Sequence, residues 1–245
     1  MHTPPRTSLA RHYAEKYAFE AGLGAKQAAI LAHPNGRKEA VAKLAYGGRG
    51  RLLEVGAGSG EVLLAVADSY AEVVATEFTP VRADHLRSLG FHVHEGPVED
   101  GLPYEPGYFD AIILNDVVEH LVEPLAVLTY LHDLLTTTGR MILHTPNAAY
   151  FRYRVQALAG KAPATSSYDE GLLDWNMRRT TALDDGHLHY FTWRSLTRVL
   201  TERAGFSRVD GHPYAGGRLS RVVLTRYLAR RLPTLLSPCC VVAHH

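Results

Sequence analysis

The sequence predicts an α/β fold, in which a doubly wound and mostly parallel β-sheet carries helices on both faces. From Arg51 onward, short apolar runs alternate with longer helical stretches, which is typical of βαβ units. The first apolar run leads directly into a glycine-rich turn, and such sheets bind ligands at this edge. The predicted strands are Arg51–Val55, Val73–Thr76, Phe91–His94, Phe109–Leu114 and Arg140–His144, with helices between them beginning near Gly60, Pro80 and Glu123.

The segments on either side of this alternation predict additions to the sheet. Residues 1–50 read as a helical cap, and residues 51–245 as one ligand-binding domain. Residues 147–185 interrupt the rhythm after the fifth strand and are predicted to form a lid, because they leave the ligand edge. The expected helices are Ser8–Ala21, Ala25–Ala32, Arg37–Ala45, Tyr150–Ala159, Leu172–Arg179 and Thr192–Ala204, and the strands Phe206–Gly211 and Leu219–Thr225 are expected to close the sheet as an antiparallel pair.

The composition is that of an ordinary globular protein, with 46% hydrophobic and 21% charged residues. A formal net charge of +1 gives no overall reason to expect nucleic acid or an anionic membrane as a partner. The two cysteines, Cys239 and Cys240, are adjacent and form neither a disulfide framework nor a metal-ligand spacing. No signal peptide or membrane span is evident, so a soluble protein of the cytoplasm is expected.

The glycine-rich turn, Glu54-Val55-Gly56-Ala57-Gly58-Ser59-Gly60, carries the strongest functional signal. Its Gly-x-Gly-x-Gly spacing differs from the Gly-x-Gly-x-x-Gly spacing that binds the pyrophosphate of dinucleotides. The charge of Glu54 would disfavour a pyrophosphate but suits the cationic amino acid end of S-adenosylmethionine. Glu77 ends the second strand, 21 residues after Gly56, at the spacing where an acid holds ribose hydroxyls. The pattern therefore predicts an S-adenosylmethionine site and disfavours a nicotinamide-dependent dehydrogenase or a scaffold protein without enzymatic activity.

From Arg51 to about Phe206 the chain resembles the class I S-adenosylmethionine-dependent methyltransferases. The resemblance rests on the glycine turn, on Glu77, and on the runs at 109–114 and 134–143. It is strongest to the group that contains the ubiquinone-type O-methyltransferases and many natural-product enzymes. The resemblance implies a Rossmann-like, seven-stranded sheet whose last strand is antiparallel. It also implies methyl transfer to a small-molecule acceptor, with oxygen as the favoured atom, nitrogen or carbon as alternatives, and a homodimer as a compatible assembly.

The resemblance also assigns cofactor contacts along the chain. Glu54, Gly56 and Gly58 would surround the methionine part, and Glu77 would hold the ribose. The loop at 96–100 would flank the adenine, although Pro97 stands where many relatives carry Asp, so that Glu99 or a backbone group would serve instead. The complete predicted set of cofactor contacts is Glu54, Gly56, Ala57, Gly58, Gly60, Glu77, Phe78, Val98, Glu99 and Asn115.

Histidines near the ligand edge are the candidates for a base, which an oxygen or nitrogen acceptor requires. His120 follows the fourth strand, and His144 ends the fifth. His187 and His189 stand just before the helix that begins near Thr192. Of these, His120, His187 and His189 are predicted as catalytic.

A divalent metal is a second interpretation of the same region. Asp116, Glu119 and His120 fall at i, i+3 and i+4, which would place all three on one face of a helix. His187 or His189 could complete the site, and such ligands suit Mg²⁺ or Mn²⁺. A Glu-x-x-Glu-His motif of this kind occurs in some ubiquinone-type O-methyltransferases and in RNA 3′-end 2′-O-methyltransferases. The second of these is an alternative function, which the near-neutral charge disfavours.

The lid is expected to select the acceptor. It carries Tyr150, Tyr153, Trp175 and the pair Arg178–Arg179, a set that suits an apolar or aromatic acceptor with an anionic group. Closure of this segment would exclude water and align the acceptor with the methyl group.

Overall fold

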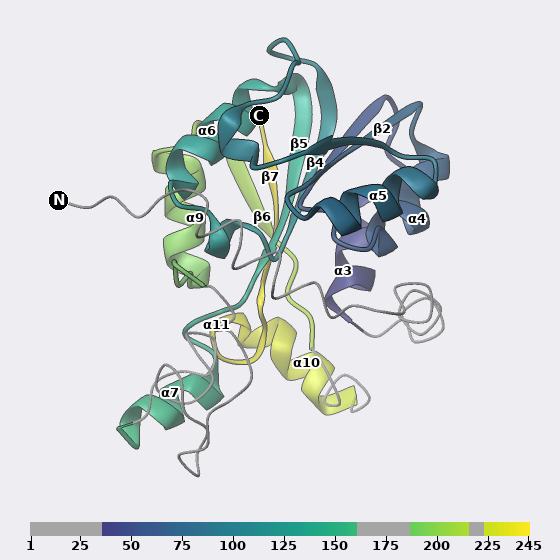
Figure 1. Cartoon of the computed structure of the whole chain (residues 1–245). Helices are drawn as coiled ribbons and strands as arrows, with labels where there is room; N and C mark the ends of the chain where they lie inside the picture. The colour runs from purple at the N-terminus through teal and green to yellow at the C-terminus, as the bar shows by residue number, and fades with distance from the viewer. Residues whose placement is uncertain (1–35, 161–186, 216–222) are drawn as a thin grey trace, which may run out of the picture.

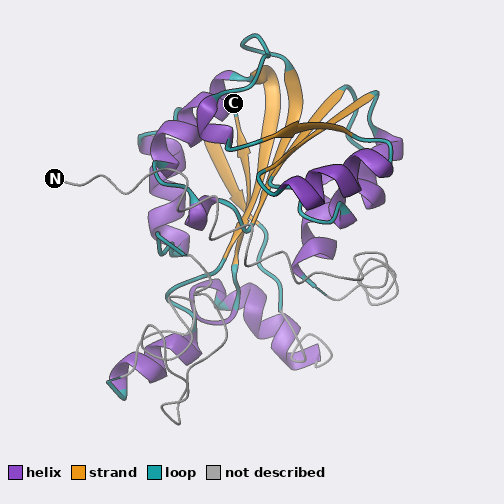
Figure 2. Cartoon of the chain, in the orientation of Figure 1, coloured by secondary structure: helices purple, strands orange, loops and turns teal. Residues whose placement is uncertain are grey.

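The computed structural model describes residues 36–160, 187–215 and 223–245, and these form a sheet flanked by helices (Figures 1 and 2). In this part of the chain the sheet has seven strands in the order β3-β2-β1-β4-β5-β7-β6. Their bounds are β1 Arg51–Val55, β2 Glu72–Glu77, β3 His92–Glu95, β4 Phe109–Asn115, β5 Leu135–Thr145, β6 Arg208–Gly211 and β7 Cys239–His244.

Strand direction in this sheet confirms the predicted fold class. The strands β1 to β5 pair in parallel, and β7 runs antiparallel to both β5 and β6. The chain order reverses at β1, which lies between β2 and β4. At such a reversal the two neighbouring crossovers leave in opposite directions, and a crevice opens at the carboxyl ends of the strands. The carboxyl ends of β1, β2 and β4 are therefore the expected edge for a ligand.

The helices cover both faces of the sheet, as Figure 1 shows for α3, α4 and α5 on one side and α6 and α9 on the other. Each side has its own apolar core. Leu63 and Leu86 belong to the first core, while Leu128 and Leu196 belong to the second. The helices are α3 Arg37–Ala45, α4 Glu61–Val66, α5 Pro80–Ser88, α6 Pro124–Asp133, α7 Phe151–Leu158, α9 Trp193–Glu202, α10 Val223–Arg231 and α11 Pro233–Leu236, with 3-10 turns at Ala67–Ser69, Val98–Asp100 and Val118–His120.

Local sequence explains where several helices begin. Proline stands at the first turn of α5, α6 and α11, where its missing N–H is not needed. Thr192 and Ser195 form a capping box at the start of α9, which satisfies two backbone donors that the helix cannot use internally. For α5, α6 and α9 these signals fix the helix starts within a few residues of their predicted positions, whereas α11 was not predicted.

The prediction of a strand at 219–225 is wrong at residues 223–225, which belong to α10, Val223–Arg231, while residues 219–222 lie outside the described residues. The strand that pairs with β5 and β6 is β7, Cys239–His244. β7 lies between two strands, so its side chains are buried on both faces and a continuous apolar run suits it. An antiparallel pair of strands at this edge of the sheet was therefore predicted correctly, but its second strand is β7 and not the segment 219–225.

The predicted cap and lid are described only in part. α3 forms where the third cap helix is expected, and α7 forms the first lid helix. The first two cap helices, residues 1–35, and the lid from 161 to 185 lie outside the described residues, as do Trp175 and the Arg178–Arg179 pair. In the described ranges no helix has the length and apolar character that a membrane crossing requires.

Candidate active site

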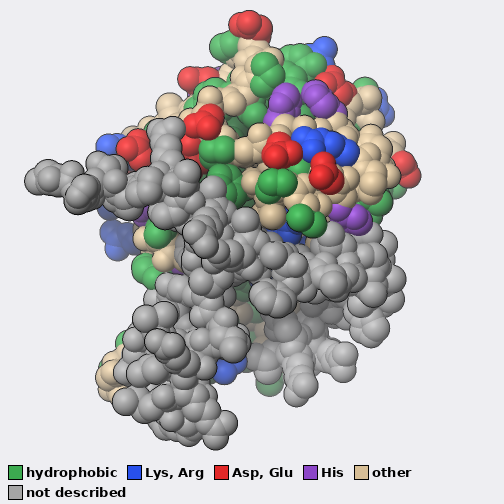
Figure 3. All heavy atoms as spheres, in the orientation of Figure 1, with side chains coloured by type: hydrophobic (Ala, Val, Ile, Leu, Met, Phe, Trp, Pro, Cys, Tyr) green, Lys and Arg blue, Asp and Glu red, His purple; other side chains and the backbone are tan. Residues whose placement is uncertain are grey.

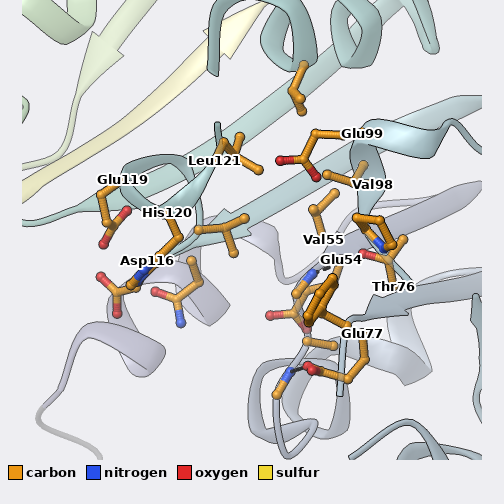
Figure 4. A pocket seen from close by; sticks show the side chains of 18 of the residues that line it. Glu54, Val55, Thr76, Glu77, Val98, Glu99, Asp116, Glu119, His120 and Leu121 are labelled. Carbon is orange, nitrogen blue, oxygen red and sulfur yellow. Dashed lines mark hydrogen bonds between the residues drawn. The ribbon is translucent and has the colours of Figure 1, made fainter. Parts of the chain in front are cut away.

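A large cleft of about 1420 Å³ opens at the carboxyl ends of β1, β2 and β4. Residues of the glycine turn line it on one side, and residues that follow β4 line it on the other. Sites for one drug-sized ligand usually measure about 300–1,000 Å³, so this cleft has room for a cofactor and an acceptor together. Figure 4 shows the two groups of side chains, with Glu54 and Glu77 on one side and Glu119 and His120 on the other.

The glycine turn after β1 takes a backbone path that requires glycine. Gly56, Gly58 and Gly60 all have positive φ, between 60° and 80°. A Cβ on Gly56 would lie 2.8 Å from Val117 Cγ2, and one on Gly60 would lie 2.8 Å from Leu86 Cδ2. Gly58 is different, because its nearest neighbour would be 3.9 Å away. The space in front of Gly58 is therefore open to a ligand.

Two residues of β2 hold this turn in place. Thr76 accepts a hydrogen bond from the N–H of Gly56 at its hydroxyl, 3.1 Å away. Glu77 accepts from the N–H of Gly58 at 2.9 Å and from the N–H of Thr79 at 2.8 Å. Burial raises the pKa of Glu77, and the backbone hydrogen bonds oppose that rise. The carboxylate of Glu77 thus lies at the cleft wall, where an acid is placed to accept ribose hydroxyls.

Glu54 is a buried carboxyl that points into the cleft. It is 2% exposed, and its Oε2 atom has no hydrogen-bond partner among the described residues. Burial raises its pKa to about 8, while the charge of Lys38 opposes the rise. Lys38 itself pairs with Glu61, with 2.5 Å between Nζ and Oε2. A buried carboxylate oxygen without a partner is costly, and a ligand ammonium would satisfy it.

The predicted adenine contacts meet beside this half of the cleft. Phe78 follows Glu77, and Val98 and Glu99 belong to the 3-10 turn after β3. One oxygen of Glu99 accepts a weak hydrogen bond from the N–H of Val122, with 3.4 Å between the atoms. Asn115 ends β4 and also lines the cleft. Of the predicted cofactor contacts only Gly60 is absent from the described lining, since it packs against Leu86 instead.

The opposite half of the cleft brings together Glu119, His120 and His187. One ligand-type atom from each lies within 4.8 Å of the other two, and the rings of the two histidines are 4.8 Å apart. The N–H groups of Leu188 and His189 donate to the carbonyl oxygen of Glu119, and these bonds hold the segment beside β4. His189 itself does not belong to the described lining of the cleft.

Glu119 is the buried member of this cluster. It is 1% exposed, and burial together with the charge of Asp116 raises its pKa to about 8. Its Oε2 atom accepts from the hydroxyl of Thr145 at 2.9 Å, while Oε1 has no hydrogen-bond partner in the described ranges. The unpartnered oxygen indicates a place for a cation or a donor group.

The prediction that 116–120 share one helical face is wrong. Asp116 has φ 57°, and only Val118–His120 form a helical turn, of the 3-10 type. The side chain of Asp116 contacts Arg37 and His144, each 2.8 Å away, and Asp116 is not one of the three residues whose donor atoms could share an ion. A left-handed residue at the strand end breaks the periodicity on which the prediction depended.

Among the cleft residues that sequence reasoning missed are Arg37 and Lys38 at the start of α3. The adjacent cations after the Pro34-Asn35-Gly36 break were the available signal. Nothing in their spacing to the glycine turn shows that α3 packs beside α4 and brings them to the cleft.

A doubly wound sheet with a glycine turn and two acids of adjacent strands in one cleft defines a Rossmann-like fold with a ligand-sized site at its carboxyl edge. Residues 25–210 match the family model of a methyltransferase domain, and the chain belongs to this family. The predicted membership of a methyltransferase family and the predicted fold class are confirmed.

The relatives of known name transfer methyl groups to different atoms. The chain is 35% identical over 103 residues to a ubiquinone biosynthesis O-methyltransferase of Xanthomonas campestris, which covers 40% of this chain and 43% of the relative. It is 28% identical over 130 residues to the ubiquinone/menaquinone biosynthesis C-methyltransferase UbiE of a Geobacter strain, covering 47% of this chain and 55% of the relative. The match thus spans about half of each relative or less.

A similar solved structure is that of the Burkholderia thailandensis 1,6-didemethyltoxoflavin-N1-methyltransferase with its acceptor and S-adenosylhomocysteine bound. It has a TM-score of 0.55 and 16% sequence identity, and covers 100% of this chain and 91% of that protein. At this identity the likeness concerns the fold.

Proposed function

We propose that the protein transfers the methyl group of S-adenosylmethionine to an oxygen atom of a small aromatic acceptor. The observation that carries this proposal is the divided cleft, in which Glu54 and Glu77 face one side and Glu119, His120 and His187 the other. A sulfonium bound on the first side would present its methyl group to the second.

In the cofactor half, Glu54 in its ionised form binds the ammonium group of the methionine part. Glu77 accepts hydrogen bonds from the ribose hydroxyls, and the open space before Gly58 allows the backbone to approach the ligand. Charge is dispersed as the methyl group moves, so alignment of donor and acceptor supplies much of the rate. The protein contributes by fixing both ligands in one cleft.

In the acceptor half, His120 accepts the proton of the attacking hydroxyl group. Its ring lies beside that of His187, and both line the cleft. A histidine is suited to this step because its ordinary pKa is near neutrality. His189 does not line the described cleft, and we leave it out of the reaction.

A divalent metal is the second candidate for this half, and the unpartnered Oε1 of Glu119 favours it. Glu119, His120 and His187 would hold Mg²⁺ or Mn²⁺, because their donor atoms lie close enough to share one ion. A bound ion would lower the pKa of the acceptor hydroxyl. In this variant of the proposal His120 is a ligand and not the base.

Other acceptors fit the described surface less well. On the face drawn in Figure 3, acidic and basic side chains are interspersed in the described part, with no broad basic field for RNA. The buried, unpaired Cys239 and Cys240 suit a reducing compartment such as the cytoplasm. A homodimer stays a prediction.

The test is transfer of a radiolabelled methyl group from S-adenosylmethionine to a panel of acceptors. The panel contains the catechol 3,4-dihydroxybenzoate, a primary amine, an enolisable diketone and a short RNA. We expect methylation of the catechol and its loss in His120→Ala, with a Glu105→Gln variant, changed on an exposed loop, as control. Methylation of the diketone alone, at its carbon and not at its enol oxygen, would show that the acceptor atom is carbon and overturn the proposal.

A further inference from the structure

Asp116 has a backbone conformation and a set of partners that the cofactor site does not explain. Its φ of 57° is the one positive value among the described residues other than glycine. Such strained residues persist where their surroundings hold them, and they gather at functional sites. Arg37 Nε lies 2.8 Å from one carboxylate oxygen, and His144 Nδ1 lies 2.8 Å from the other. Each oxygen of the Asp116 carboxylate thus has a partner, and Asp116 lines the cleft.

The contacts of Asp116 extend through His144 to a residue far along the chain. His144 Nε2 lies 2.8 Å from the hydroxyl oxygen of Tyr214, 70 residues later. Tyr214 follows β6, and its own N–H donates to the hydroxyl of Ser237 at 3.0 Å. The N–H of His212 donates to the carbonyl oxygen of Cys240 on β7. The hydroxyl that meets His144 is therefore held by the antiparallel edge of the sheet.

The charge states of Asp116 and Tyr214 define which atoms donate and which accept in the hydrogen bonds of His144. Burial would raise the pKa of Asp116, but the hydrogen bond from His144 and the charge of Arg37 hold it below its usual range. Burial raises the pKa of Tyr214, so its hydroxyl keeps the proton. An ionised Asp116 only accepts, which requires a proton on His144 Nδ1. When the imidazole ring is neutral, Nε2 then accepts from Tyr214, and every donor has one acceptor.

We propose that His144 and Tyr214 are positioning residues of the acceptor half, which hold Asp116 and, through it, Arg37 at the cleft wall. The inference rests on the proposed methyl transfer. Neither residue belongs to the described cleft lining, whereas Asp116 and Arg37 both do. The contacts from Tyr214 to His144 and from His144 to Asp116 thus link the β6–β7 edge of the sheet to the carboxyl end of β4, beside His120.

Amide substitutions separate the two contacts of His144. Asn in its place can donate to Asp116 from the position of Nδ1, whereas Gln can reach Tyr214 from the position of Nε2. We expect His144→Gln to lower kcat with 3,4-dihydroxybenzoate about tenfold, because the donor to Asp116 is lost, whereas Tyr214→Phe keeps that donor and should lower kcat only about threefold. His144→Asn should stay within about threefold of the wild type, and adding Tyr214→Phe to it should change nothing more.

Affinity for S-adenosylhomocysteine and the melting temperature separate positioning from a structural role. Both should stay close to wild type in Tyr214→Phe and His144→Asn. Tyr108→Phe is the matched control, since Tyr108 precedes β4 and its hydroxyl donates to Glu72 at the start of β2, and neither residue lines the cleft. Equal losses of kcat in His144→Asn and His144→Gln, or a fall in melting temperature that accounts for the loss, would overturn the inference.

The imidazole nitrogen signals of His144 in an NMR spectrum report the same network without turnover. In the wild type we expect the tautomer with its proton on Nδ1. In Tyr214→Phe the proton should stay on Nδ1, because Asp116 still accepts it, while the Nε2 signal should shift because it loses the hydrogen bond from Tyr214. An unchanged Nε2 signal in this variant would contradict the role of Tyr214. A wild type that methylates nothing would instead contradict the proposed function, and these signals would still decide whether Tyr214 fixes His144.

Discussion

Glu77 at the end of β2 accepts a hydrogen bond from the N–H of Gly58 in the turn that follows β1, with 2.9 Å between the atoms. The same carboxylate also accepts from the N–H of Thr79. One acid therefore fixes the glycine turn and the start of α5, and it borders the space where the ribose would lie.

We expect Glu77→Ala to weaken S-adenosylhomocysteine binding about 10- to 100-fold, because hydrogen bonds to a charged group are lost. Glu77→Gln should lose less, since its amide oxygen can still accept one backbone bond. Calorimetric titration measures both variants. Glu95→Ala at the end of neighbouring β3, where the carboxylate pairs with Arg87 on the surface, is the control and should bind as the wild type does.

The glycine turn gives a prediction on stability. Gly60→Ala should lower the free energy of unfolding by about 1–3 kcal/mol, because the new Cβ meets the fully buried Leu86 and φ is 80°. Gly107→Ala is the control, with a similar φ of 76° and nothing within 4 Å of the new Cβ. Urea unfolding compares the two. Equal losses would mean that backbone strain, and not packing on Leu86, explains why glycine is needed.

The raised pKa of Glu54 predicts pH-dependent binding. Without ligand, this carboxyl is largely protonated below about pH 8, and a bound ammonium group favours its ionised form. S-adenosylhomocysteine should therefore release a proton on binding at pH 7, and its affinity should rise between about pH 6 and pH 8. Titration in buffers of different ionisation enthalpy counts the protons. The release should vanish in Glu54→Gln, and its persistence there would point to another group.

The same pKa shift predicts how stability of the protein without ligand depends on pH. The folded state holds the proton of Glu54 up to about pH 8, whereas an ordinary carboxyl loses it near 4.5. Between these values the unfolded state binds fewer protons, so the contribution of Glu54 to stability falls as pH rises. Glu54→Gln should flatten this part of the profile in urea unfolding. A steeper profile in the variant would contradict the assignment.

The metal variant of the proposal predicts that EDTA abolishes turnover and that Mg²⁺ or Mn²⁺ restores it. Mn²⁺ binding, followed by electron paramagnetic resonance, should weaken in Glu119→Gln, because the unpartnered oxygen is replaced by an amide group. Glu123→Gln at the cleft rim is the matched control. Full turnover in EDTA, with no Mn²⁺ bound, would leave His120 as the base.

Much of the fold could be predicted because local patterns decide it. The apolar runs at β1, β2 and β4 and the prolines at the helix starts are signals within a few residues, and the structure follows them. β7 was not predicted because two apolar segments of the sequence were both candidates for the strand between β5 and β6. A run such as Cys239–Ala243 and one such as Val222–Leu224 differ little in sequence, and only packing between β5 and β6 separates them.

The candidate site likewise has one half that could be predicted from the sequence and one half that could not. The glycines and strand-end acids of the cofactor half follow from spacing along two adjacent strands. The acceptor half depends on tertiary structure, which brings His187 beside His120 and pairs Asp116 with Arg37. The left-handed backbone at Asp116 has no clear local signal, because Asp tolerates that conformation without requiring it.

The central claim is that this cleft binds S-adenosylmethionine and not a dinucleotide. Calorimetric titration of the wild-type protein with S-adenosylhomocysteine and, separately, with NAD tests it most directly. We expect S-adenosylhomocysteine to bind in the micromolar range and NAD at least about tenfold more weakly, because the buried Glu54 can ionise to pair with an ammonium group but offers a pyrophosphate no positive charge. Tighter binding of NAD than of S-adenosylhomocysteine would contradict the account.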